Sequence, residues 1–294
     1  MDFKKHSTAL LISSLLTPFI SVTAVAETLP AGVSLAKDQH LVRANDAEAA
    51  TLDPAKAEGL PEMHILRDLF EGLVIQDRDG NITPGVAESW ETEDNQTFVF
   101  HLRKDAKWSN GDPVTADDFV YAIRRAVDPK LASPNVWYLK LTRINNIADV
   151  AEGKKPVEYL GISAVDKHTV KFELDSKVPY FVAMTGHTSM MPVHKATLEN
   201  SDKPWSDPKQ FVGNGAFVLD EWVINERIEL KKNPNYWASS DTNLTQVTYI
   251  PFENQNASIN RYAVGEVDIT SDVPTHMAQQ LKTKYQDAFT AVPL

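Results

Sequence analysis

The 294-residue sequence contains no cysteine, and this absence excludes several kinds of site at once. Without thiolates the protein forms no disulfide, iron–sulfur cluster or cysteine-ligated zinc site, and it has no thiol nucleophile. Glycine and proline are also few, with 12 and 17 residues, whereas 43% of the residues are hydrophobic. This composition excludes a collagenous or low-complexity sequence and predicts a folded protein of one large or two ordinary domains.

Basic residues are in the minority. The protein has 29 Lys and Arg against 40 Asp and Glu, which gives a formal net charge of −11. Because contacts with phosphate are supplied by clustered Lys and Arg, this balance argues against a broad nucleic-acid-binding face.

Long apolar runs are confined to the N-terminus. Lys4 and Lys5 precede the apolar stretch Ala9–Val22, and the small residues of Thr23–Ala26 supply a cleavage site. The alternative, a transmembrane helix, needs about 20 apolar residues, which is more than this stretch offers. We therefore predict a signal peptide cleaved after Ala26 and export without a lipid anchor, since a lipoprotein signal requires cysteine.

The hydrophobic pattern predicts a mixture of helices and strands. Ile65, Leu66, Leu69 and Phe70 indicate a helix that starts near Pro61, and Thr115 with Asp118 forms a capping box that opens a second helix. Further segments are predicted as strands at Gln39–Arg43, Phe98–Leu102, Val170–Leu174, Phe217–Trp222, Ile228–Leu230, Val247–Ile250 and Val267–Ile269, as a helix at Asn256–Val264, and as either at Pro179–Thr188. The class is therefore α/β or α+β, without internal repeats.

One segment resembles the start of a calcium loop. Asp77 to Asn81 has suitable spacing, and Glu88 stands at the closing position. The sixth position, however, holds Ile82 where the calcium loop requires glycine. An Asp-Gly turn in a β-hairpin is the favoured interpretation.

No catalytic constellation is evident. The sequence has no nucleophile elbow, zinc helix, Walker loop or dinucleotide fingerprint. His187 and His194 are seven residues apart with Pro192 between them, which does not favour a shared metal site. Asp117 and Asp118 stand where acids favour the opening turn of a helix. We therefore expect neither an enzyme nor a cofactor.

The segment Ser133–Tyr138 is predicted to be a loop that carries two aromatic side chains. Trp137 is its most conspicuous member, because an aromatic residue on a loop suits the wall of a binding cleft.

Several longer strings resemble a known family. Pro84–Trp90 and Phe98–Phe119 look like the signature of the large solute-binding proteins that serve peptide importers, extracellular solute-binding protein family 5. Three further family segments follow in the family's order at Gly213–Phe217, Asn233–Trp237 and Gly265–Ile269. The resemblance is greatest to the branch that binds oligopeptides, on the strings Arg67–Leu73, Val178–Phe181 and Asn225–Ile228.

This resemblance implies a two-lobed periplasmic receptor that closes around a short peptide and presents it to the membrane permease of an ABC importer. It implies a monomer that binds without catalysis. The expected fold is a lobe like that of type II periplasmic binding proteins, in which residues 27–70 and 186–294 form a sheet-based domain and residues 71–185 form a smaller inserted domain.

The resemblance also implies the site. The peptide is held as an added extended strand, and Glu58, Gly59 and Leu60 resemble the segment that contacts it. The Glu58 carboxylate would then lie near the peptide's amino end, whereas without the resemblance a solvated loop acid is the favoured interpretation. Asn135 replaces a family aromatic residue in the cleft loop beside Trp137, and Asn214 and Gly215 belong to another family segment.

Members of this family continue beyond the position of Leu294 into a second lobe. We therefore expect this chain to supply one side of the site and to bind peptide weakly or not at all. Two alternatives remain: a receptor for a murein (cell-wall) peptide within the same family, and a secreted peptidase.

Overall fold

The structure is a computed structural model that describes residues 34–200 and 207–290. The predicted signal peptide and its cleavage site lie outside these residues. In the described part of the protein, no helix has the length and apolar character needed to cross a membrane.

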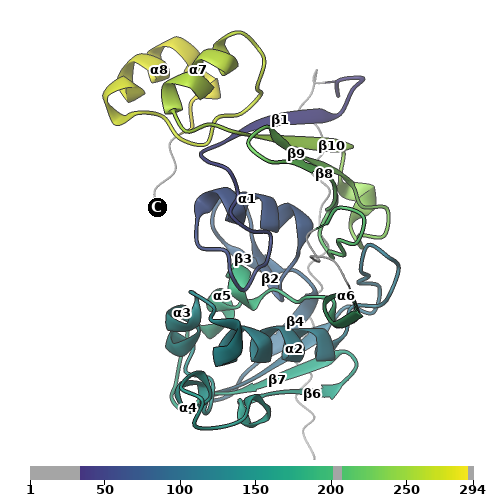
Figure 1. Ribbon diagram of the computed structural model, residues 1–294. Helices are drawn as coiled ribbons and strands as arrows, with labels where there is room; N and C mark the ends of the chain where they lie inside the picture. The colour runs from purple at the N-terminus through teal and green to yellow at the C-terminus, as the bar shows by residue number, and fades with distance from the viewer. Residues whose placement is uncertain (1–33, 201–206, 291–294) are drawn as a thin grey trace, which may run out of the picture. The chain divides into compact units, whose positions relative to one another are not determined.

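The first sheet is assembled from segments that are far apart in the sequence. Its order is β1 (His40–Asn45), β10 (Gln246–Pro251), β9 (Arg227–Lys232) and β8 (Phe217–Val223). β1 runs parallel to β10, and the remaining pairs are antiparallel. Leu219, Leu230 and Tyr249 from this sheet are buried in one core with α1 (Leu60–Leu69), which lies against it (Figure 1).

The second large sheet comes from the middle of the sequence. It is antiparallel throughout, in the order β4 (Ala87–Glu91), β5 (Thr97–Leu102), β7 (Thr169–Glu173) and β6 (Ile162–Asp166). Phe98, Phe100 and Phe172 point to its buried face and pack with Phe181, with ring centroids 4.8–6.5 Å apart. The predicted alternation of apolar residues in β5 is confirmed.

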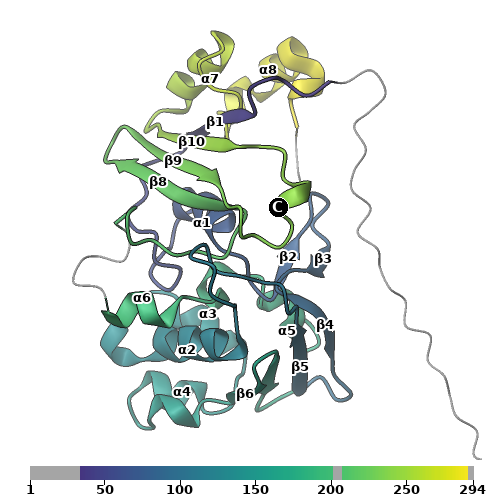
Figure 2. The same ribbon diagram turned by 90° about the vertical axis from the view of Figure 1, so that its right-hand side faces the viewer.

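The helix α2 (Ala116–Val127) covers this second sheet, as Figure 2 shows. Its buried stripe consists of Phe119, Ala122, Ile123 and Ala126 with their neighbours. The Asp118 carboxylate accepts hydrogen bonds from the backbone N–H of Thr115, at 2.8 Å, and from its hydroxyl, at 2.9 Å, and the predicted capping box is present.

The calcium-loop candidate is a hairpin turn. β2 (Val74–Gln76) pairs with β3 (Ile82–Pro84), and the Asp77 carboxylate between them accepts hydrogen bonds from the backbone N–H groups of Asp79 and Asn81. Gly80 has a φ of 84°, the left-handed conformation that favours glycine. The hairpin prediction is confirmed.

The remaining helices lie between the strands or follow the last one. The other α-helices are α3 (Val136–Leu141), α4 (Ile147–Ala151), α5 (Phe181–Met184), α6 (Lys195–Asn200), α7 (Gln255–Ala263) and α8 (Ala278–Tyr285). The short 3-10 helices are η1 (Pro129–Leu131), η2 (Val157–Tyr159), η3 (Thr188–Met190), η4 (Ser239–Asp241), η5 (Thr275–Met277) and η6 (Gln286–Ala288).

Two local predictions are wrong. Val267–Ile269 is not a strand, because Ile269 forms only an isolated parallel bridge with Arg43. Ser133–Tyr138 is not a loop throughout, because α3 begins at Val136 and places both aromatic residues on a helix. The open choice for Pro179–Thr188 resolves as the short helix α5 followed by η3.

Sheet membership follows the expected division of the sequence. The strands of the first sheet lie within residues 27–70 and 186–294, and those of the other sheet and the hairpin lie within 71–185. The buried hydrophobic residues of both regions nevertheless form one continuous cluster. The two-domain division stays a prediction.

Candidate functional site

The predicted contact residues Glu58, Gly59 and Leu60 lie at the start of α1. Glu58 and Leu60 are exposed, and Gly59 is the residue at which the helix is capped. The carboxylate of Glu62 closes this end by accepting hydrogen bonds from the backbone N–H groups of Gly59, at 3.1 Å, and Ala50, at 2.8 Å. The backbone between the exposed residues Glu58 and Leu60 is therefore held in place at Gly59.

The hydrogen-bonding groups of Glu58 have no partner among the described residues. Within residues 34–200 and 207–290, its backbone N–H and carbonyl groups and its carboxylate form no hydrogen bond or ion pair. An extended ligand can therefore reach hydrogen-bonding groups that need not first break an internal bond.

Asn135 lies next to this segment, but its side chain is buried rather than open to a ligand. Its amide nitrogen donates hydrogen bonds to the carbonyls of Ala57, at 2.9 Å, and Ala55, at 3.4 Å. The hydroxyl of Ser133 also donates to the carbonyl of Ala55. The structure thus brings Asn135 and Glu58 together, with the Asn135 amide turned toward the backbone.

Trp137 is two residues further on, in α3, and 64% of its surface is exposed. The next residue, Tyr138, stacks on His187 with the ring centroids 4.0 Å apart and donates its hydroxyl to the carbonyl of Met184. Burial raises the pKa of Tyr138 to about 12. Tyr138 therefore anchors α3, whereas Trp137 is the aromatic side chain that solvent or a ligand can contact.

Asn214 and Gly215 lie at the opposite end of α1. Asn214 is buried, and its side chain forms hydrogen bonds with the backbone N–H and carbonyl of Glu71, at 3.0 and 2.9 Å. The Gly215 N–H donates to the carbonyl of Leu69. Ten residues of α-helix span about 15 Å, so the structure does not bring this pair to Glu58.

The C-terminal end of α1 holds two acids, of which Glu71 is buried and Asp68 is half-buried. The carboxylate of Glu71 accepts hydrogen bonds from the Tyr236 hydroxyl and from the Trp237 indole, whose ring stacks beneath Arg103. Burial raises the pKa of Glu71 to about 7 despite these partners. Burial likewise raises the pKa of Asp68 to about 6, against the hydrogen bond donated by Tyr249. These acids join α1 to the first sheet and its adjoining loop.

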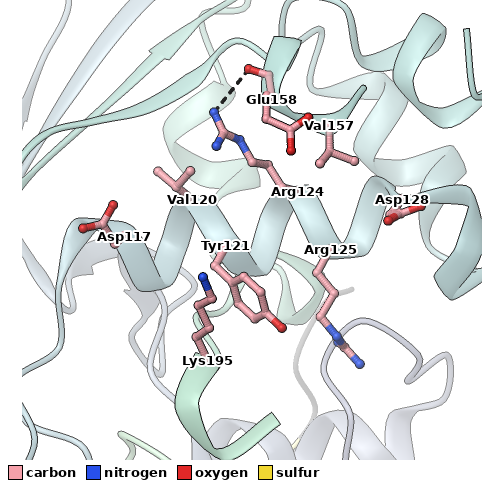
Figure 3. Close-up of a pocket in the computed structure, with 9 residues that line it drawn as sticks. All are labelled: Asp117, Val120, Tyr121, Arg124, Arg125, Asp128, Val157, Glu158 and Lys195. Carbon is pink, nitrogen blue, oxygen red and sulfur yellow. Dashed lines mark hydrogen bonds between the residues drawn. The ribbon is translucent and has the colours of Figure 1, made fainter. Parts of the chain in front are cut away.

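A cavity of about 590 Å³ opens beside α2 (Figure 3). Three cations line it, and each already has partners. Arg124 donates to the carbonyl of Glu158, Arg125 turns away to the carboxylate of Asp53, and Lys195 lies 5.4 Å from the ring centroid of Tyr121. The cavity therefore offers little to an anionic ligand.

Sequence reasoning missed three residues that shape the site: Asp53, Arg125 and Ser133. The turn at Leu52–Pro54 was visible in the sequence, and so was the Ser-Pro pair of the following segment. Arg125 is 72 residues from Asp53, however, and no local signal relates them.

Comparison with known proteins identifies the family. The sequence profile of the bacterial extracellular solute-binding proteins, family 5 middle region, matches residues 81–293. The chain is 49% identical to the periplasmic oligopeptide-binding protein OppA of Escherichia coli over 265 residues, covering 90% of this chain and 49% of that protein. It is 46% identical to the periplasmic murein peptide-binding protein MppA of the same organism over 277 residues, covering 94% and 51%.

Solved structures give the same result. The unliganded open form of MppA matches with a TM-score of 0.84 at 46% identity, over 86% of this chain and 49% of that one. Haemophilus influenzae OppA in complex with the peptide RPPGFSPFR matches with a TM-score of 0.83 at 43% identity, over 86% and 50%. The predicted mixed α/β fold is confirmed, and the chain spans about half the length of these relatives. The chain belongs to family 5 of the bacterial extracellular solute-binding proteins.

Proposed function

We propose that this chain supplies one wall of a monomeric periplasmic receptor that binds short peptides and delivers them to the membrane permease of an ABC importer. The observation that carries the proposal is the fixed and exposed segment at Glu58, whose backbone groups are unpaired within the described residues. The relatives named above are periplasmic peptide-binding proteins, and one of them is solved with a peptide. The proposed role is binding without catalysis.

The geometry suits recognition of a peptide backbone. Glu58 can donate its N–H to a peptide carbonyl and accept a peptide N–H at its own carbonyl, as one strand does with another. Such contacts do not depend on the peptide's side chains. The exposed side chains of Leu60 and Trp137 offer apolar surface nearby, at exposed fractions of 58% and 64%. The Glu58 carboxylate provides a negative charge for the peptide's ammonium group.

A titration followed by NMR tests the proposal, with trialanine as the probe. We expect the backbone amide signals of Glu58 and Gly59 to shift and to saturate at a Kd of about 1 mM, because a few exposed hydrogen bonds give weak affinity. Shifts that avoid Glu58 and Gly59, or no shifts at millimolar trialanine, would contradict the proposal. Trialanine recovered as free alanine would instead support the peptidase alternative.

The role of the Glu58 carboxylate has its own test. We expect Glu58→Gln to weaken trialanine binding about threefold, in line with the modest strength of exposed ion pairs, and to leave N-acetylated trialanine unaffected. Glu88→Gln is the matched control, because Glu88 is an exposed glutamate of β4. Equal losses for the free and acetylated peptides would show that the carboxylate does not contact the ammonium group.

A receptor for murein peptides is the second candidate. The observation behind it is the structural match to MppA, which is as good as the match to Haemophilus influenzae OppA, with TM-scores of 0.84 and 0.83. Mass spectrometry of ligands extracted from natively purified protein separates the two. A mixture of short peptides favours general peptide uptake, whereas a single wall-derived peptide favours the second candidate.

A further inference from the structure

We propose that Asn135 is a positioning residue: its side-chain amide fixes the backbone of Ala55–Ala57 and thereby presents the unpaired backbone groups of Glu58 to an extended peptide. The inference rests on the proposed function, because it concerns the same segment. It differs from the role expected from the resemblance, in which the residue at position 135 contacts the ligand directly.

The N–H groups of the segment are held from one side by Asp53. The Arg125 guanidinium binds both carboxylate oxygens of Asp53, at 3.0 and 2.6 Å, and this carboxylate accepts the N–H of Ala55 at 3.0 Å. The Asp53 carbonyl accepts the N–H groups of Lys56 and Ala57, at 2.9 and 3.0 Å. The Asp53 side chain is only 4% exposed, so this anchor is largely shielded from water.

The carbonyl groups are held from the other side by Ser133 and Asn135. Ala55 receives hydrogen bonds from both side chains, and in the described part of the protein Asn135 is the only donor to the carbonyl of Ala57. Asn135 is 4% exposed, and its own N–H donates to the Ser133 hydroxyl at 3.2 Å. The carbonyl of Ala57 therefore depends on one side chain.

The bonding pattern alternates along the segment. Ala57 uses both its N–H and its carbonyl inward, and so does Gly59, which donates to Glu62 and accepts from Met63. In an extended segment, successive residues direct their backbone groups to opposite sides. Glu58, which lies between two inward-bonded residues, is thus left with its N–H and carbonyl on the open side. This arrangement resembles an edge strand bonded along one side only, with a turn carbonyl and side chains in place of a neighbouring strand.

Fixing Ala57 matters because the segment lies outside regular secondary structure. A mobile segment must be ordered when a ligand binds, and a prearranged one avoids this loss of affinity. Among the described residues, no strand pairs with this segment, and Asn135 supplies the hydrogen bond that a neighbouring strand would otherwise donate to the carbonyl of Ala57. Its removal is expected to loosen Ala57 and to weaken peptide binding without removing any group that touches the peptide.

The test compares Asn135→Ala with Asn235→Ala in the full-length protein. Asn235 is the matched control, because its amide donates a hydrogen bond of 2.9 Å to the backbone carbonyl of Ser109, away from this segment. Three quantities are measured: the hydrogen-exchange rate of the Ala57 amide without ligand, the affinity for trialanine by NMR, and the Tm. We expect N135A to exchange about tenfold faster at Ala57 and to bind about tenfold more weakly, since one net hydrogen bond corresponds to about one factor of ten. N235A should lower the Tm similarly and change neither of the other two quantities.

Either of two results overturns the inference: unchanged exchange at Ala57 in N135A, or faster exchange with unchanged trialanine affinity. If the parent protein does not bind trialanine, the proposed function fails, and so does the presentation of Glu58 to a peptide. Faster exchange of the Ala57 amide in N135A would then still show that Asn135 fixes this backbone. Asn135→Leu serves where N135A does not fold, because its branched side chain has a similar shape but no group that can donate a hydrogen bond. Normal exchange of the Ala57 amide in N135L would likewise count against the inference.

Discussion

At the scale of single residues, the glycines that join α1 to the first sheet are fixed by close backbone approach. A Cβ atom on Gly215 would lie 2.4 Å from the carbonyl oxygen of Asp68, and a Cβ on Gly213 would lie 2.2 Å from that of Leu69. Both neighbours are backbone atoms of α1, whose apolar face is packed in the core, so these atoms cannot yield without moving the helix. The family segment Gly213–Phe217 therefore has a structural reason in this protein that is independent of any ligand.

We predict that Gly215→Ala lowers the free energy of unfolding by about 3 kcal/mol, because the new methyl group forces the backbone of α1 apart from the loop. Gly186→Ala is the control, since its nearest contact would be an ordinary 3.4 Å. Urea denaturation measures both variants. If the free energy of unfolding falls no more for G215A than for G186A, the loop around Gly215 moves to accommodate the methyl group and the prediction is wrong.

The limit of sequence reasoning is also visible at this scale. The strings that contain Asn135 and Asn214 mark both as members of family segments, and they do lie in ordered and buried places. The sequence cannot show where their amides point. That depends on which backbone groups the fold leaves unpaired, and here these are the carbonyls of Ala55 and Ala57 and the backbone groups of Glu71.

At the scale of elements, α2 is tied to the segment before α1 through the buried pair of Arg125 and Asp53. The periodicity of α2 and its cap were predictable, because both are encoded within a dozen residues. The ion pair was not, because its partners are 72 residues apart in the sequence and only the fold brings them together. The wrong strand at Val267–Ile269 has a similar origin: its short apolar alternation fits a strand, yet only Ile269 pairs with its neighbour, and the Asp268 carboxylate accepts the N–H of Val42 instead.

We predict that Arg125→Met destabilises the protein by about 3 kcal/mol, because it leaves the Asp53 carboxylate buried without its counter-charge. The double variant Arg125→Met with Asp53→Asn should lose clearly less than the two single variants combined, giving a coupling of about 2 kcal/mol. Lys155 and Asp149 are the control pair, because their side chains are 40% and 43% exposed, so the same cycle should give at most about 1 kcal/mol. Chemical denaturation provides all the values, and additive losses at Arg125 and Asp53 would contradict a buried pair.

At the scale of the whole molecule, the first sheet unites segments that are about 200 residues apart in the sequence. β1 pairs with β10 in parallel, and Asp268 and Ile269 bond to the outer side of β1. Strand patterns predicted the strands of this sheet but not their order, which the structure supplies. Three titratable groups in α1 or just after it, Glu71, Asp68 and His64, also meet partners from distant parts of the sequence.

The two acids and His64 make the stability of the protein depend on pH in opposite directions. Burial raises the pKa of Glu71 from 4.5 to about 7 and that of Asp68 from 3.8 to about 6. An acid whose pKa is raised on folding adds stability that is complete below its unfolded pKa and is lost as the pH rises through the folded value. Burial, with the nearby charges of Arg43 and Arg67, lowers the pKa of His64 from 6.5 to about 4. Its contribution is complete above pH 6.5 and is lost as the pH falls toward 4.

We therefore predict that two substitutions tilt the profile of Tm against pH in opposite directions. Relative to the parent protein, Glu71→Gln should gain stability as the pH rises from 4.5 to 8, by up to about 3 kcal/mol, because the parent then bears a buried negative charge. His64→Gln should gain stability relative to the parent as the pH falls from 6.5 to 4, because the parent must then either ionise a half-buried imidazole or keep neutral a group that water would protonate. Calorimetry from pH 4 to 8 measures both differences. Profiles parallel to that of the parent would mean that neither group changes its proton affinity on folding. The side chains of Glu71 and His64 would then be accessible to water.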